Sequence, residues 1–158
     1  MDAAEQVARY AEPLGITCLF EDQGIYLNGL AGFGKFFYEL KRRCSNVGVC
    51  GDVGNILFVD EDPVDFFEMF KEDIKHVHIK DYLRKPAAKQ SIGHYWLPTR
   101  GGQWLRETMV GSGIVDFESC MKVLKSVGYQ GGLGLELGHP EPFEVGVQQA
   151  MEYLNKFK

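Results

Sequence analysis

The sequence contains no long apolar run, no pair of cysteines at short spacing and no cluster of basic residues. Nothing in it approaches the roughly 20 consecutive apolar residues of a membrane-spanning helix, so we expect no membrane partner. The net charge is −5, from 17 basic and 22 acidic residues, and a protein without a basic face is a poor candidate for binding nucleic acid. The first residues are polar and amphipathic, unlike a secretory signal, so we expect a cytoplasmic protein.

The cysteines are also few and scattered. None of the four is spaced as in a C-x-x-C motif, and two of them lie in apolar runs that are typical of strands. We therefore interpret all four as reduced thiols in or near the core of an intracellular protein. At 158 residues, with 45% hydrophobic and 25% charged residues, the chain has the size and composition of one globular domain.

Segments typical of strands alternate with segments typical of helices. After a first helix that ends near Pro13, we expect strands over 16–21, 47–52, 74–81 and 131–138, and helices over 36–44, 64–73, 117–128 and 142–156. Strict alternation implies a parallel sheet with right-handed crossovers. Asp62 and Asp116 precede two of the helices and are their expected N-caps.

One stretch breaks the alternation. Residues 82–115 are polar and aromatic and show the periodicity of neither a helix nor a strand. A loop of this length without structure of its own is uncommon and is usually functional, for example as a lid. The alternative is a partly disordered surface loop.

Each expected strand carries a residue that can bind a divalent metal at or near its carboxyl end. These residues are Glu21, Asp52, His78 and Glu136. Because the carboxyl ends of parallel strands point to one face of a βα-repeat protein, we expect the four side chains to converge there. Three carboxylates and one imidazole make a hard site suited to Mn²⁺, Mg²⁺ or Co²⁺. An acidic residue at a strand end is by itself more often a helix cap or an ion-pair partner, so the prediction depends on all four together.

The strand expected over 74–81 has one polar face. His76, His78 and Lys80 alternate with apolar residues, which suits either a barrel interior or an exposed edge strand. Lys80 itself has two interpretations. It either donates a hydrogen bond within the site or points outward and pairs with Asp81, and we favour the second.

Four sequence segments carry a family resemblance: VGVCGDVGN, IKHVHIKDY, the GSGIVDF turn and YQGGLGLELG. Together they resemble the xylose-isomerase-like (βα)₈ barrels of the sugar phosphate isomerase/epimerase group, which includes ketose 3-epimerases and inosose dehydratases. The most specific part is the HVHIKD strand followed by G-x-G-x-x-D-F. The resemblance implies an α/β fold in a single domain over residues 1–158. This domain would be the C-terminal half of a (βα)₈ TIM barrel, with four parallel strands, alternating helices and a long βα loop over 82–115.

The resemblance also implies a site. One divalent metal, Mn²⁺ first with Mg²⁺, Co²⁺ or Zn²⁺ as alternatives, would be held by Glu21, Asp52, His78 and Glu136. Glu21 and Glu136 would also be the catalytic acid and base. The implied contacts to substrate fall on four further residues: Asn55, His76, Lys80 and Arg84. Asn55 stands where the family usually has a histidine, which weakens its assignment, although an amide can still bind a sugar hydroxyl.

The implied function is a metal-dependent sugar or sugar phosphate isomerase or epimerase. It would move a proton through a metal-stabilised enediolate of a small-molecule sugar substrate. One alternative is an inosose-type dehydratase or related lyase, in which Lys80 protonates a leaving hydroxyl. Another is a catalytically silent metal-binding half-domain. A full barrel needs about 250 residues, so we expect either self-association, a complementary N-terminal half, or a truncated form.

Overall fold

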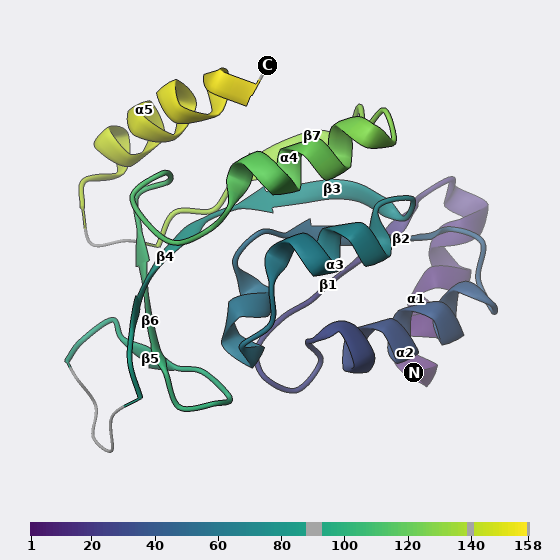
Figure 1. Ribbon diagram of the computed structural model, residues 1–158. Helices are drawn as coiled ribbons and strands as arrows, with labels where there is room; N and C mark the ends of the chain where they lie inside the picture. The colour runs from purple at the N-terminus through teal and green to yellow at the C-terminus, as the bar shows by residue number, and fades with distance from the viewer. Residues whose placement is uncertain (88–92, 139–140, 158) are drawn as a thin grey trace.

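A four-stranded parallel sheet lies at the centre of the molecule. The structure is a computed structural model that describes residues 1–87, 93–138 and 141–157. The strands stand in the order β1-β2-β3-β7, and each neighbouring pair runs parallel, with all four carboxyl ends on the left of Figure 1. They span β1 (Cys18–Glu21), β2 (Val47–Asp52), β3 (Ile74–Ile79) and β7 (Gly132–Leu135). The predicted α/β architecture of four parallel strands with alternating helices is confirmed.

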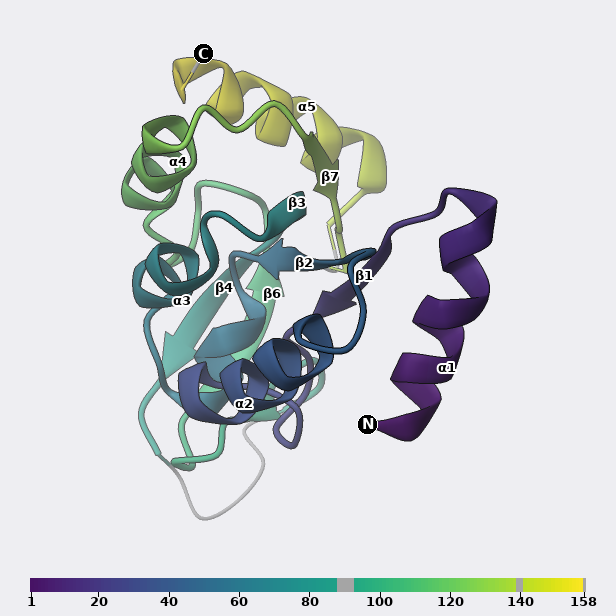
Figure 2. The same ribbon diagram turned by 90° about the vertical axis from the view of Figure 1, so that its right-hand side faces the viewer.

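Helices follow the strands in the predicted alternation. In Figure 2, α2, α3 and α4 lie along the outer side of the curved sheet, while α1 lies beyond β1 and α5 lies beyond β7. No helix within the described ranges is long and apolar enough to cross a membrane. The α-helices are α1 (Asp2–Ala11), α2 (Leu30–Lys41), α3 (Pro63–Phe70), α4 (Phe117–Ser126) and α5 (Phe143–Leu154). The short 3₁₀ helices are η1 (Glu12–Leu14), η2 (Asn55–Val59) and η3 (Asn155–Phe157).

Phenylalanines fill the core between the sheet and helices α2 and α3. The Phe66 and Phe70 rings lie 4.6 Å apart between centroids, and Phe33 meets Phe70 edge-on at 5.3 Å. All three are fully buried, and each buried ring stabilises the fold by about 1.5–3 kcal/mol relative to exposure. Helix α2 precedes β2 in the chain and α3 follows it, so this packing also holds β2 in position.

Helix α2 begins earlier than the sequence predicted. Its first residue is Leu30, whereas the helix was expected to start at residue 36 after a glycine-rich loop. Two contacts with later residues accompany this start: the Leu30 N–H donates to Oε2 of Glu61 over 2.6 Å, and a Cβ on Gly34 would lie 2.7 Å from Cε of Met69 in α3. Glycine is a poor helix former in isolation but is tolerated where two helices need to approach closely.

The predicted N-caps are confirmed. The Asp62 carboxylate accepts a hydrogen bond from the Val64 N–H over 2.8 Å, and Asp116 accepts one from the Ser119 N–H over 3.0 Å. Each cap satisfies a backbone donor that a helix start leaves without a partner. The expected location of the cysteines in or near the core also holds, since three are buried and Cys18 is half-buried.

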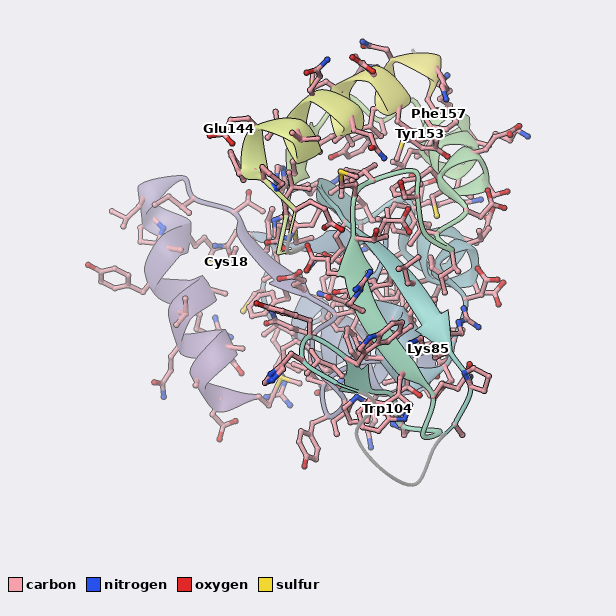
Figure 3. All side chains as sticks on the ribbon, turned by 90° about the vertical axis from the view of Figure 1, so that its left-hand side faces the viewer. Cys18, Lys85, Trp104, Glu144, Tyr153 and Phe157 are labelled. Atoms are coloured by element: carbon pink, nitrogen blue, oxygen red, sulfur yellow. The ribbon has the colours of Figure 1, made fainter. Side chains whose placement is uncertain are left out.

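The expected structureless loop over 82–115 is wrong for its described part, which forms a second sheet. It consists of β4 (Asp81–Lys85), β5 (Leu97–Pro98) and β6 (Trp104–Thr108), antiparallel in the order β4-β6-β5. Figure 3 looks onto the carboxyl ends of the parallel strands and shows β4 and β6 in front of them, with Lys85 and Trp104 near one end. The chain therefore passes from β3 almost directly into a structure that stands beside the predicted site.

Candidate metal centre

The parallel sheet brings the four predicted ligands to one level. Glu21 is the last residue of β1, Asp52 is the last of β2, and His78 is the register partner of Asp52 in β3. Glu136 follows β7 directly, and its N–H donates to the Ile79 carbonyl over 3.0 Å, which continues the pairing beyond the strand. Four separate strands thus present one side chain each at the carboxyl edge.

The four side chains form a compact cluster. Nδ1 of His78 lies 3.1 Å from Oε1 of Glu21, 3.2 Å from Oε1 of Glu136 and 3.9 Å from Oδ2 of Asp52. One ligand atom from each residue can be chosen so that all lie within 4.8 Å of one another. Ligand atoms held at about 2.1 Å from a single ion lie about 3–4 Å apart, so the three distances from His78 fit one divalent cation, and the widest separation in the cluster fits after a small movement of the side chains.

Asp52 supports the same conclusion. Its side chain is fully buried, and Oδ1 accepts hydrogen bonds from the N–H groups of Gly54 and Asn55, both over 2.8 Å. Oδ2 makes no hydrogen bond of acceptable geometry within the described residues, although Nζ of Lys80 lies 3.0 Å away. Burial raises the pKa of Asp52 to about 6, even though Lys80 and the backbone donors oppose the shift. A buried carboxylate oxygen that is short of partners is a suitable metal ligand.

Lys80 lies inside the cluster and does not pair with Asp81, so the favoured interpretation of this lysine was wrong. Only 7% of the residue is exposed, and Nζ lies 2.5 Å from Oε2 of Glu136 and 3.3 Å from Oδ1 of Asn55. Burial lowers the pKa of Lys80, but Asp52 and Glu136 outweigh it and the net shift is upward. For Glu136, burial raises the pKa, but the hydrogen bond and charge of Lys80 dominate and the net shift is downward. The lysine is therefore an ammonium that keeps Glu136 ionised.

Asp81 has a different role, which the sequence did not reveal. Its buried carboxylate accepts four backbone hydrogen bonds, and through them it holds the loop that leads to α4 against the end of β3. Burial raises the pKa of Asp81, and these same hydrogen bonds oppose the shift. The donors are the N–H groups of Tyr82 (2.8 Å), Gly111 (3.0 Å), Gly113 (2.8 Å) and Val115 (3.1 Å).

Asn55 connects the two sides of the cluster. Its Nδ2 donates to Oε1 of Glu21 over 2.9 Å, and its backbone carbonyl accepts from Nδ2 of Asn28 over 2.7 Å. Behind it, Oδ1 of the buried Asp22 accepts from the Asp52 N–H over 3.3 Å. Neither Asn28 nor Asp22 was predicted from the sequence as part of the site. Their positions next to a predicted strand end and before a helix were the only available signals.

The other two predicted substrate-binding residues lie at different distances from the cluster. His76 is on the same face of β3 as His78, with ring centroids 5.3 Å apart, and faces the small residues Gly132 and Gly134 of β7. Arg84 is not brought to the cluster. It lines a separate hollow together with Leu57, Asp60, Glu61, Asp62, Pro63, Thr99, Ile114 and Asp116.

Comparison with known proteins gives a consistent picture. An inosose dehydratase of Lacticaseibacillus casei is 27% identical over 115 residues, which are 69% of this chain and 37% of the relative. One from Clostridium botulinum strain Eklund 17B is 32% identical over 89 residues, covering 54% of this chain and 28% of the relative. The chain therefore spans between 28% and 37% of the length of these curated relatives.

Solved structures share the fold. A xylose isomerase domain protein from Planctomyces limnophilus superposes with a TM-score of 0.74 at 20% identity, over 98% of this chain and 49% of the other. The zinc-bound IOLI protein gives 0.73 at 18% identity, over 99% and 54%. The 3-keto-D-glucoside 4-epimerase of E. coli gives 0.67 at 19% identity, over 98% and 51%. This chain matches about half of each barrel.

The family model of the xylose isomerase-like TIM barrels matches residues 1–157. This match covers nearly the whole chain, and the parallel sheet with its alternating helices is the fold that such a barrel requires. The chain belongs to the xylose isomerase-like TIM barrel family.

Proposed function

We propose that this chain carries the metal centre and the proton-transfer groups of a sugar or sugar phosphate isomerase or epimerase. The observation that carries the proposal is the convergence of Glu21, Asp52, His78 and Glu136, whose ligand atoms lie within 4.8 Å of one another. Three of the four donors are oxygens, so Mn²⁺ is our first candidate, with Mg²⁺, Co²⁺ or Zn²⁺ as alternatives. A bound divalent cation would supply positive charge that stabilises the enediolate of a keto-sugar.

We propose that the two glutamates act on opposite sides of a substrate. Glu21 ends one edge strand of the parallel sheet and Glu136 follows the other, with His78 between them at 3.1 and 3.2 Å. The side chain of Glu136 is 43% exposed, and that of Glu21 is 21% exposed. One glutamate, as the carboxylate, can remove the proton beside the carbonyl, while the other, once protonated, gives its proton to the opposite face, which inverts the stereocentre.

Asn55 and Lys80 would keep these two groups in position. The Asn55 amide holds Glu21 as an acceptor over 2.9 Å, and the Lys80 ammonium holds Glu136 as a carboxylate over 2.5 Å. An acid and a base that are held in a fixed orientation lower the activation barrier for proton transfer more than groups that are merely close. The centroids of the His76 and His78 rings lie 5.3 Å apart, and we propose that His76 contacts the substrate. We also propose that Arg84, which lines a separate hollow, contacts the substrate when a complete barrel closes around the site.

Dehydration of an inosose-like ketone is a second candidate. Two observations favour it, namely the curated relatives, which are inosose dehydratases, and the ammonium of Lys80 within the cluster. An ammonium has three N–H donors, and three oxygens lie within 3.3 Å of this one. The contact with Oδ2 of Asp52 at 3.0 Å is not a hydrogen bond of acceptable geometry, so a leaving hydroxyl could accept from the donor on that side.

Half of a barrel does not enclose a substrate. Because the chain matches about half of each superposed structure, we propose that a second copy or a complementary N-terminal half completes the barrel in the cytoplasm. Without a second copy or a complementary N-terminal half, we propose a third function, in which the chain is a catalytically silent metal-binding half-domain.

The experiment is a reaction of the purified chain with Mn²⁺ and either a ketose or an inosose in deuterated water. Deuterium appearing beside the ketose carbonyl, seen by NMR, supports the isomerase or epimerase. Loss of water with an enone absorbance supports the dehydratase. Glu136→Gln should abolish either signal, while Glu144→Gln, at an exposed carboxylate of α5, should leave it unchanged. Metal binding with neither signal supports the silent half-domain.

A further inference from the structure

We propose that Lys80 sets the charge preference of the metal centre, so that the site favours divalent over trivalent cations. The inference rests on the proposed function, because it takes the four-residue cluster to be a cation site. Lys80 is a charged side chain that is almost completely buried, and it stands beside the oxygens that would bind the cation. Buried charges of this kind are expensive unless they are balanced.

The ammonium shares oxygens with the metal site. Oδ2 of Asp52 lies 3.0 Å from Nζ of Lys80 and 3.9 Å from Nδ1 of His78, so the same atom faces both. The Glu136 carboxylate is divided between them, with Oε2 at 2.5 Å from Lys80 and Oε1 at 3.2 Å from His78. The lysine is therefore a direct neighbour of any cation held by these carboxylates.

A third contact fixes the ammonium. Oδ1 of Asn55 lies 3.3 Å from Nζ, and Asn55 is itself held through its backbone N–H and carbonyl by Asp52 and Asn28. The stem of Lys80 is confined as well, because a Cβ on Gly54 would lie 2.9 Å from its Cγ. The positive charge has no direct way to withdraw when a cation binds.

The charges then balance for a divalent ion. Three carboxylates and one ammonium give the cluster a net charge of −2 when His78 is neutral, which a divalent cation neutralises. A trivalent cation leaves one positive charge beside the buried side chains of Asp52 and Lys80. Coulomb energy is proportional to the product of the charges, so the repulsion between Lys80 and a trivalent ion is about 1.5 times its repulsion of a divalent ion at the same position.

The test compares Mn²⁺ and Tb³⁺ on the full chain. Dissociation constants are measured by calorimetry for Mn²⁺ and by Tb³⁺ luminescence, at one pH, and expressed as the ratio of the Mn²⁺ to the Tb³⁺ constant. A substitution that only displaces the ligands weakens the binding of both ions, so its effect largely cancels in this ratio. A change in the net charge of the site affects the two ions unequally and does not cancel. Asp22, which lies behind Asp52, is the same in every variant and does not affect the comparison.

Two variants change the site charge by −1 in different ways. Lys80→Gln removes the positive charge and keeps a polar side chain. Asn55→Asp adds a negative charge and changes neither Lys80 nor any of the four ligand residues, but it removes the amide that donates to Glu21, a loss of positioning that the ratio is chosen to cancel. Lys80→Arg keeps the charge. Lys122→Gln is the matched control, because Lys122 is an exposed lysine of α4 that pairs with Glu118.

We expect the ratio to rise at least tenfold in Lys80→Gln and in Asn55→Asp, and to stay within threefold of wild type in Lys80→Arg and Lys122→Gln. If either Lys80→Gln or Asn55→Asp does not fold by circular dichroism, the other decides the question. An unchanged ratio in a folded variant, with Mn²⁺ binding intact in wild type, overturns this inference alone. Failure of the wild-type chain to bind either ion overturns the proposed function and the inference with it.

Discussion

Gly113 is pressed against the carboxylate of Asp81. Its N–H donates to Oδ2 over 2.8 Å, and a Cβ built on Gly113 would clash with Oδ1 of Asp81 and with the carbonyl oxygen of Tyr82. The loop before α4 can therefore wrap around the end of β3 only because this position has no side chain. The contact fixes this loop to the residue that follows Lys80 in the chain.

Gly113→Ala should destabilise the chain by about 1–3 kcal/mol, because the new methyl group meets backbone and a buried carboxylate that have no room to move. The measurement is urea unfolding followed by circular dichroism. Gly32→Ala is the matched control, since Gly32 lies in α2 and a Cβ there meets nothing within 4 Å. It should stabilise the chain by about 0.5–1 kcal/mol. Equal effects of the two substitutions would refute the close contact.

Asp81→Asn should lower the free energy of unfolding by about 2 kcal/mol or more, although it is nearly isosteric. The carboxylate accepts four N–H groups, whereas an amide can accept on one side only and turns its own donors toward the rest. Asp65→Asn, at an exposed position of α3, is the control and should change stability by about 0.5 kcal/mol or less. A loss in Asp81→Asn no larger than in the control would show that the loop is held by other contacts.

The N-cap of α4 gives a pH-dependent prediction. Hydrogen bonds from Ser119 lower the pKa of Asp116, so its contribution to stability is present above the unfolded-state pKa and is lost as pH falls through the lowered folded-state value. Asp116→Ala should therefore cost about 1 kcal/mol at neutral pH. That difference from wild type should shrink as the pH falls below about 4. Urea unfolding of wild type and Asp116→Ala at neutral pH and below about pH 4 measures this difference. A difference that grows in acid would contradict the role of the ionised Asp116 as the N-cap of α4.

Much of the parallel sheet could be predicted from the sequence. The strand over 47–52 and both helix caps are where the pattern placed them, because a continuous apolar run and an Asp before a helix are local signals. The start of α2 at Leu30 could not be predicted, since the Leu30 N–H has its partner in Glu61, a residue distant in the sequence. The sheet formed by β4, β5 and β6 was missed because its strands are short and polar and are stabilised by pairing with each other.

The candidate site was predicted more completely than its surroundings. The positions of Glu21, Asp52, His78 and Glu136 follow from one residue at each strand end, and the parallel register brings them together. The partner of Lys80 was predicted incorrectly, although neighbouring residues of a strand point to opposite faces and should not be expected to pair. Its true partners, Asp52 and Glu136, are distant in the sequence and are set by the order of the strands.

The central claim is that these four side chains form one metal site, and calorimetric titration of the purified chain with Mn²⁺ tests it most directly. We predict one bound Mn²⁺ per chain in wild type and in the control Asp65→Asn, and binding at least 100-fold weaker in Asp52→Asn and in Glu136→Gln. Unchanged Mn²⁺ affinity in both Asp52→Asn and Glu136→Gln would contradict the account.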